Sequence, residues 1–269
     1  MYKLVALDVD GTLLNEKHQI SKRSKKVIKK LIDSGVKIVL ASGRPYLSLI
    51  KIAEELKLST PLISNNGALV KFQNGEIILY KYISAENAKA LLAYARKKEL
   101  YTTFYFPERL CVDKLTKEAK LHLEVEGIKP VEVGDLARVV DQKPIAIHFK
   151  EEVEKIEALV KDLKEKFGDC LSVMQSAVSH IDVMHSSVSK GRALEATIKR
   201  LNIKAEEVIS FGNSFNDLEM LEAAGCGVAV ANSPAGVKEK ADKITLSNRE
   251  DGVAVILEDL IKTGQMKGI

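Results

Sequence analysis

The chain has 269 residues, of which 46% are hydrophobic and 29% are charged, and its formal net charge is +4. This length suits two domains better than a single core, and no apolar run is long enough for a membrane-spanning helix or a secretion signal. The three cysteines lie too far apart in the sequence for a zinc site or a disulfide framework, so we expect a reducing, cytoplasmic setting.

The first predicted element is a strand that ends in two carboxylates. Residues 4–7 form an apolar run of the kind that buried parallel strands have, and an Asp-Val-Asp-Gly-Thr stretch at 8–12 follows directly. In open α/β sheets the ligand crevice lies at the carboxyl ends of the strands, so we expect Asp8 and Asp10 there. Because two carboxylates this close are costly without a cation or a shared proton, the stretch predicts a metal site.

Strands and helices then alternate along the first part of the chain. Ser21 is placed to cap a helix whose apolar face carries Val27 and Leu31, and Gly35 is placed to end it. The basic residues of this helix, at 22–30, have no aromatic residues between them, which indicates a solvated face and not a nucleic-acid site. The elements that follow are a strand at 36–41, a helix at 46–58, a strand at 62–64 and a hairpin of 69–72 with 77–80.

The pattern changes between residues 84 and 185. Helices are predicted at 85–98 and 151–167, and strands at 102–106, 145–149 and 179–184. Strand-helix alternation then returns, with strands at 208–211, 227–231 and 244–246. A module interrupted by an insertion explains this order better than two domains in series. We therefore predict an α/β protein with a Rossmann-like, mostly parallel core (residues 1–83 and 186–269) and an inserted α/β cap (residues 84–185), hinged near Ser84 and His185.

Polar side chains gather at other ends of the predicted core strands. They are Ser42, Gly43 and Arg44 after the strand at 36–41, Asn65 and Asn66 after the strand at 62–64, Lys190 where the core resumes, and Gly-Asn-Ser-Phe-Asn-Asp at 212–217 after the strand at 208–211. Each group alone is a weak signal, because an Asp-x-Asp is often only a turn and Lys190 could be only a surface lysine. Their shared place at strand ends predicts one common site.

Four of these groups resemble the motifs of the haloacid dehalogenase superfamily. The matching positions, in chain order, are residues 8–12, Ser42, Lys190 and residues 212–217. The insertion between the second and third motifs, together with Ser-Asn-Asn-Gly-Ala at 64–68, resembles the Cof-type branch of sugar- and metabolite-phosphate phosphatases. The resemblance covers the whole chain, including Arg-Glu-Asp-Gly-Val at 249–253.

The resemblance implies a Mg²⁺-dependent phosphatase that forms an aspartyl-phosphate. Asp8 resembles the nucleophile, and Asp10 resembles the general acid that protonates the leaving alkoxide and later activates water. Mg²⁺ prefers oxygen ligands in octahedral geometry, which suits Asp8, the backbone carbonyl of Asp10 and a group from Asn213 or Asp217. The residues assigned to the phosphorylated substrate are Val9, Thr12, Ser42, Gly43, Arg44, Asn65, Asn66, Lys190 and Asn216.

One position departs from the family pattern. The family usually has Asp directly after Gly212, where this chain has Asn213. An amide oxygen can ligate Mg²⁺ but brings no charge. Two interpretations stay open: Asn213 coordinates the metal directly, or it lies outside the ligands and Asp217 contributes more to the coordination of the metal.

Three other functions also stay open: a phosphosugar mutase, a phosphoacceptor signalling domain and a non-catalytic binding protein. A carboxylate two residues beyond the nucleophile, at Asp10, favours hydrolysis over a stable phosphoaspartate. We expect the partner to be a small phosphorylated metabolite, such as a sugar phosphate or a phosphorylated cofactor, with no nucleic acid or membrane, and the protein to be a monomer or weak homodimer. Glu108, Arg109 and Lys114, in a predicted cap loop, are the sequence candidates for substrate specificity.

Overall fold

The computed structural model describes residues 1–116, 120 and 127–268. The chain divides into two compact units. Unit 1 comprises Met1–Ser42, Leu49–Leu79 and Ser189–Ile269, and unit 2 comprises Gly43–Ser48 and Tyr80–Val188. Within the described part of the chain, no helix has both the length and the apolar character needed to cross a membrane.

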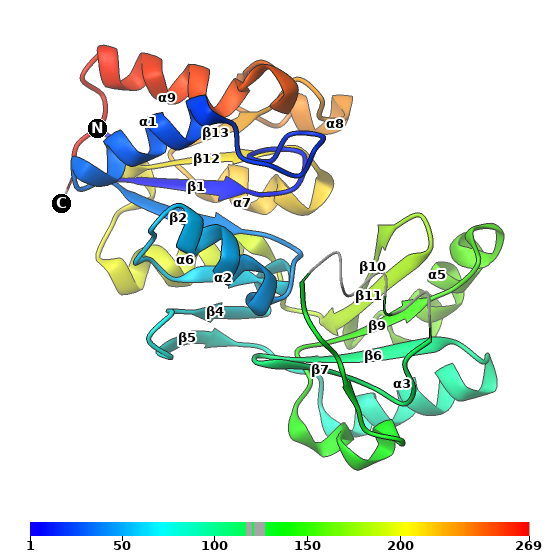
Figure 1. The fold of residues 1–269 in the computed structure, drawn as a ribbon. Coiled ribbons are helices and arrows are strands. Elements are labelled where there is room, and N and C mark those ends of the chain that lie inside the picture. Colours follow the sequence, from blue (N-terminus) through cyan, green and yellow to red (C-terminus); the bar gives the residue numbers. More distant parts are fainter. Residues whose placement is uncertain (117–119, 121–126, 269) are drawn as a thin grey trace. The chain divides into compact units, whose positions relative to one another are not determined.

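Unit 1 is built on an eight-stranded sheet in the order β14-β13-β12-β1-β2-β3-β4-β5 (Figure 1). The strands from β14 to β3 run parallel, and β4 pairs antiparallel with β3. The predicted mostly parallel α/β core is thus confirmed, with β1 between β12 and β2. The strands are β1 Leu4–Asp8, β2 Lys37–Ala41, β3 Leu62–Ser64, β4 Leu69–Lys71, β5 Ile77–Tyr80, β12 Val208–Gly212, β13 Cys226–Ala229 and β14 Lys243–Ile244.

Helices cover both faces of this sheet. Leu4 and Ala6 of β1 belong to one buried cluster with Leu194 of α6 and Met220 of α7. The side chains between these residues of β1 point to the opposite face of the sheet. Figure 1 shows α1 and α9 side by side on that face. The helices are α1 Lys22–Asp33, α2 Tyr46–Glu55, α6 Lys190–Leu201, α7 Leu218–Ala223, α8 Ala235–Lys238 and α9 Gly252–Lys262.

Short polar signals in the sequence set the ends of the helices that carry the site. The Ser21 side chain caps α1 as predicted, accepting the N–H three residues further on at 2.9 Å. Gly35 follows the same helix with a φ of +85°. Ser189 caps α6 in the same way, with 3.2 Å to the Arg192 N–H. Lys190 is therefore the first residue of α6.

Unit 2 contains a six-stranded sheet in the order β10-β11-β9-β6-β7-β8. Its neighbours pair antiparallel except for β7 with β8. Leu91 of α3 and Leu163 of α5 pack with Phe104 and Phe149 in the core of this unit. The elements are α3 Ala85–Lys97, β6 Tyr101–Phe106, β7 Arg109–Val112, β8 Val131–Glu132, β9 Ala146–Lys150, α5 Val153–Phe167, β10 Leu171–Ala177 and β11 His180–His185.

The prediction that Glu108, Arg109 and Lys114 lie in one cap loop is wrong, because β7 occupies the middle of that segment. Only Glu108, before the strand, and Lys114, after it, lie outside regular structure. The Arg109 side chain donates to Gln142 and lies 5.1 Å from the centre of the Phe106 ring. The sequence did not predict β7, because a strand of four residues that starts with Arg gives too short a pattern to identify. It did not predict β10 either, because the second half of that strand is polar.

The boundaries between the two units lie a few residues outside the predicted insertion of 84–185, since unit 2 runs from Tyr80 to Val188. The Tyr80 hydroxyl donates to the Lys143 carbonyl at 2.7 Å, and the Ile83 N–H donates to the Pro144 carbonyl at 2.8 Å. These hydrogen bonds tie the segment before α3 to unit 2. Ser84 and His185, the residues named for the hinge, therefore both lie within unit 2.

Candidate active site

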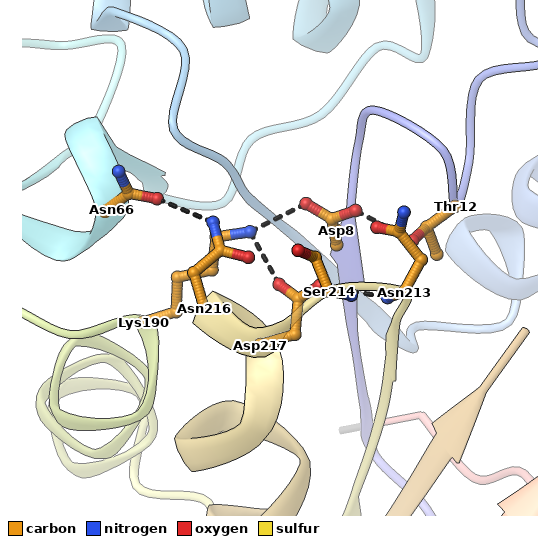
Figure 2. Close-up of polar contacts among 8 residues, drawn as sticks. All are labelled: Asp8, Thr12, Asn66, Lys190, Asn213, Ser214, Asn216 and Asp217. Carbon is orange, nitrogen blue, oxygen red and sulfur yellow. Dashed lines mark hydrogen bonds and ion pairs between the residues drawn. The ribbon is translucent and has the colours of Figure 1, made fainter. Parts of the chain in front are cut away.

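β1 ends in the first carboxylate of the site. Asp8 is the last residue of β1 and is only 4% exposed. Its Oδ2 accepts a hydrogen bond from Thr12 Oγ1 at 2.7 Å, and its Oδ1 accepts one from Lys190 Nζ at 2.7 Å (Figure 2). The turn that brings Thr12 back to Asp8 passes through Gly11, whose φ of +78° favours glycine.

Lys190 joins two carboxylates inside the protein. Its Nζ lies 2.7 Å from Asp8 Oδ1 and 2.6 Å from Asp217 Oδ1, and none of the three side chains is more than 6% exposed. Asp217 Oδ2 accepts the backbone N–H groups of Asn213 at 2.9 Å and Ser214 at 3.0 Å. Both oxygens of Asp217 are thus engaged by protein donors. This geometry favours a role in positioning Lys190 over the predicted role as a metal ligand.

The charges of this cluster do not balance. Burial, and after it the charge of Asp217, raises the pKa of Asp8 to about 7, although Lys190 acts in the opposite direction. Burial lowers the pKa of the Lys190 ammonium, but the charges of Asp217 and Asp8 outweigh it and raise that pKa above its ordinary value. With Lys190 protonated, one negative charge is left over when both carboxylates are ionised. A cation beside Asp8 would offset it.

The Asn213 side chain lies beside Asp8 Oδ2, the oxygen that also accepts the Thr12 hydroxyl. One end of its amide is 3.0 Å from Asp8 Oδ2, 3.1 Å from the Asp10 carbonyl oxygen and 3.2 Å from Thr12 Oγ1. Adjacent oxygen ligands of an octahedral Mg²⁺, each about 2.1 Å from the ion, are about 3 Å apart. The Asp8 carboxylate, the Asp10 carbonyl and the Asn213 amide oxygen therefore fit a Mg²⁺ site. Among the described residues, no group of three or more His, Cys, Asp or Glu side chains is arranged to hold a metal.

Asp8 and Asp10 have opposite surroundings. Between them Val9 is fully buried, and its carbonyl accepts the Leu13 and Leu14 N–H groups at 3.1 and 2.9 Å. The Asp10 side chain is 44% exposed, with Oδ1 3.9 Å from His18 Nδ1. One carboxylate is thus fixed in the interior, and the other is accessible to water and to a bound molecule.

A second polar group lies at the ends of β2 and β3. The Ser42 carbonyl accepts the Asn66 N–H at 3.0 Å, and Asn66 Oδ1 accepts Asn216 Nδ2 at 2.9 Å (Figure 2). Asn65 and Asn66 have φ values of +47° and +55°, in the left-handed region that Asn tolerates. Within the described part of the chain, the buried oxygens Asn65 Oδ1 and Asn216 Oδ1 have no hydrogen-bond partner.

Gly43 and Arg44 belong to unit 2, with the first turn of α2. There Arg44 Nη1 donates to Ser48 Oγ at 3.3 Å. The other predicted site residues all lie in unit 1: Asp8, Val9, Asp10, Thr12, Ser42, Asn65, Asn66, Lys190, Asn213, Asn216 and Asp217.

Two asparagines outside the predicted site hold the loop after β1. Asn232 Nδ2 donates to the Gly11 carbonyl at 2.8 Å, and Asn232 Oδ1 accepts the Asn248 N–H at 3.0 Å. Asn248 Nδ2 donates to the Leu14 carbonyl at 2.8 Å. The signal in the sequence was position after a strand, because Asn232 lies three residues after the end of β13.

Known proteins resemble this chain along nearly its whole length. The family of haloacid dehalogenase-like hydrolases matches residues 5–257. The Bacillus subtilis phosphatase YwpJ is 30% identical over 287 residues, which cover 96% of this chain and 100% of that protein. The 5-amino-6-(5-phospho-D-ribitylamino)uracil phosphatase YcsE of the same species is 30% identical over 253 residues, which cover 94% of this chain and 93% of that protein.

A solved structure agrees with these sequence relatives. A haloacid dehalogenase-like hydrolase from Bacteroides thetaiotaomicron superposes with a TM-score of 0.90 at 27% identity, over 97% of this chain and 100% of that one. The match therefore includes both units of the chain. Together with the four motifs at their strand ends, these likenesses show that the chain belongs to the haloacid dehalogenase-like hydrolases, in their Cof-type branch, and is a phosphoric monoester hydrolase.

Proposed function

We propose that the protein is a Mg²⁺-dependent phosphatase of small phosphomonoesters that works through an aspartyl-phosphate on Asp8. The observation that carries this proposal is the setting of Asp8: a buried carboxylate at a strand end, with Lys190 on one oxygen and the Asn213 amide beside the other. Lys190 favours the ionised form that a nucleophile needs. Asp217, held by two backbone N–H groups, keeps Lys190 in place.

The reaction then divides between Asp8 and Asp10. An Asp8 oxygen attacks phosphorus, and the bond between phosphorus and the leaving oxygen breaks while Asp10 donates its proton to that oxygen. Asp10 next takes a proton from water, whose attack on phosphorus releases inorganic phosphate and restores Asp8. A Mg²⁺ held by Asp8, the Asp10 carbonyl and Asn213 would supply positive charge for the transferring phosphoryl oxygens.

The leaving group that suits this site carries hydrogen-bond donors. Asn65 Oδ1 and Asn216 Oδ1 are buried acceptors without partners among the described residues, and the amide nitrogen of Asn216 donates to Asn66 (Figure 2). An unsatisfied buried acceptor costs about 1–3 kcal/mol, which a substrate hydroxyl would relieve where substrate binding opens access to the oxygen. Sugar phosphates and phosphorylated cofactors with a polyol chain have such hydroxyls. The relative YcsE is named for a phosphoribityl compound of this kind.

The test is a screen for phosphate release with Mg²⁺ present. The panel holds sugar phosphates, 5-amino-6-(5-phospho-D-ribitylamino)uracil, a phosphoprotein and DNA with phosphorylated ends, and the Asp8→Asn variant is the matched control. Turnover of several small monoesters by the wild type alone supports the proposal. Phosphoryl transfer within a sugar without phosphate release indicates a mutase, and a stable phosphoprotein without turnover indicates a phosphoacceptor domain. Activity confined to the two polymers would refute the proposed substrate class.

A further inference from the structure

The Asn213 amide is enclosed by atoms that accept hydrogen bonds. Its inner end lies 3.0 Å from Asp8 Oδ2, 3.1 Å from the Asp10 carbonyl oxygen and 3.2 Å from Thr12 Oγ1. Thr12 Oγ1 lies within hydrogen-bond distance of both Asp8 Oδ2, at 2.7 Å, and the inner end of the amide, at 3.2 Å. Because its single proton favours the closer, charged carboxylate, the Thr12 hydroxyl offers a lone pair to the amide. All three neighbours are therefore acceptors.

The identity of the inner atom depends on whether a cation is bound. Without a cation, an inward oxygen would face a carboxylate and a carbonyl oxygen, whereas an inward Nδ2 donates to all three neighbours. With Mg²⁺, an inward oxygen becomes a ligand, at the spacing of about 3 Å that adjacent octahedral ligands have. Figure 2 draws the second orientation, with the amide oxygen toward Asp8.

The exchange between the two orientations needs little movement. The two ends of an amide have nearly the same size, so a half-turn about the last side-chain bond swaps them in place. Gly11 packs against the outer end, where a Cβ would lie 2.5 Å from the amide atom. The absence of a side chain at Gly11 leaves room for the amide in either orientation.

We propose that the Asn213 amide stands in for the cation: Nδ2 points inward in the Mg²⁺-free protein, and Oδ1 turns inward when Mg²⁺ binds. This inference rests on the Mg²⁺ site of the proposed function. Its physical basis is charge. Asp8, Asp217 and Lys190 already leave one negative charge, and the partly positive NH₂ group offsets it where an aspartate would add another. Asn213 thus stabilises the Mg²⁺-free site and weakens Mg²⁺ binding.

The first experiment measures thermal stability in EDTA and across a Mg²⁺ titration. We expect Asn213→Asp to melt roughly 2–4 °C or more below the wild type in EDTA. We also expect it to bind Mg²⁺ about tenfold or more tightly, since it adds a charged ligand, and so to show the larger rise in melting temperature with Mg²⁺. Asn248→Asp is the matched control, because Asn248 donates to a backbone carbonyl of the same loop at 2.8 Å. The difference in melting temperature between Asn248→Asp and the wild type should be the same in EDTA and in Mg²⁺.

The second experiment follows the amide of the wild-type protein by NMR. The Asn213 side-chain NH₂ signals are identified as the pair missing from the Asn213→Asp spectrum, and we expect both to shift as Mg²⁺ saturates the site. An unmoved pair, with Mg²⁺ binding evident from the melts, would overturn the inference and leave the phosphatase proposal intact. An Asn213→Asp variant as stable in EDTA as the wild type would also overturn it. Absence of any Mg²⁺ effect on either protein would refute the Mg²⁺ site itself.

Discussion

Replacement of Asp217 by Asn would remove one charge from the buried ion-pair cluster and keep the shape of the side chain. In the wild type, one Asp217 oxygen accepts Lys190 Nζ at 2.6 Å and the other accepts two backbone N–H groups, from Asn213 and Ser214. An asparagine has only one oxygen. Either Lys190 or the pair of N–H groups must then face an NH₂ group, which offers them no acceptor.

The magnitude follows from burial. A buried donor left without an acceptor costs about 1–3 kcal/mol, and more when the donor is charged. Lys190 is 1% exposed and keeps Asp8 as a partner at 2.7 Å, so its charge stays paired and the cost comes from the lost hydrogen bond to a buried ammonium; we expect about 3 kcal/mol. At roughly 2–4 °C per kcal/mol for a chain of this size, the melting temperature should fall by about 6–12 °C.

The assay is urea denaturation in EDTA, followed by far-UV circular dichroism. Asp242→Asn is the control, because Asp242 is exposed and accepts a single backbone N–H, from Gly227, at 2.7 Å. Its loss should cost about 1 kcal/mol or less. If Asp217→Asn were within about 0.5 kcal/mol of the wild type, the range of ordinary surface changes, the account of Lys190 as a buried cation held by two carboxylates would be refuted.

Asp8→Asn should abolish phosphate release without unfolding the protein, since an amide is a poor nucleophile; wild-type turnover in this variant would exclude Asp8 as the nucleophile. Asp10→Asn should keep Mg²⁺ bound through the unchanged carbonyl yet slow turnover by roughly 10²–10⁴, and a rate near wild type would remove Asp10 as the acid. Removal of Mg²⁺ by EDTA should stop phosphate release, and added Mg²⁺ should restore it. Burial raises the pKa of Asp182, on β11, from 3.8 to about 7. Because the folded state then holds a proton that the unfolded state releases, the contribution of Asp182 to stability should be full below about pH 3.8 and lost as the pH rises to about 7. Denaturation curves of Asp182→Asn should lack that pH dependence.

The core of the fold could be predicted because its sequence signals are local. β1 is an apolar run that ends in Asp8, and polar residues follow directly after β2 and β12. The Ser21 cap follows from a hydroxyl placed before an apolar helical face. Parallel strands bring their carboxyl ends to one edge of the sheet, which gathers Asp8 with the segment after β12 although more than half the chain separates them. That grouping requires no knowledge of individual contacts.

The contacts themselves could not be predicted, since they depend on distances through space. From the sequence, Asp217 and Asn213 are equally good candidates for an oxygen ligand of the metal. Only the geometry shows that both oxygens of Asp217 already accept hydrogen bonds, from Lys190 and from two backbone N–H groups. The role of Asn232 on the Gly11 carbonyl was hidden for the same reason. A single asparagine after a strand carries no sign of which backbone oxygen it will reach.

The spacing of Asp8 and Asp10 connects the sequence to the chemistry most directly. Side chains two positions apart lie on the same face of an extended strand, yet here the chain leaves the strand between them and turns at Gly11. Asp8 therefore stays in the interior against Lys190, while Asp10 keeps its carbonyl beside Asn213 and exposes 44% of its side chain. A nucleophile needs a fixed, ionised carboxylate, and a proton carrier needs access to water and the leaving group. A strand that ends at the first carboxylate supplies both environments within three residues.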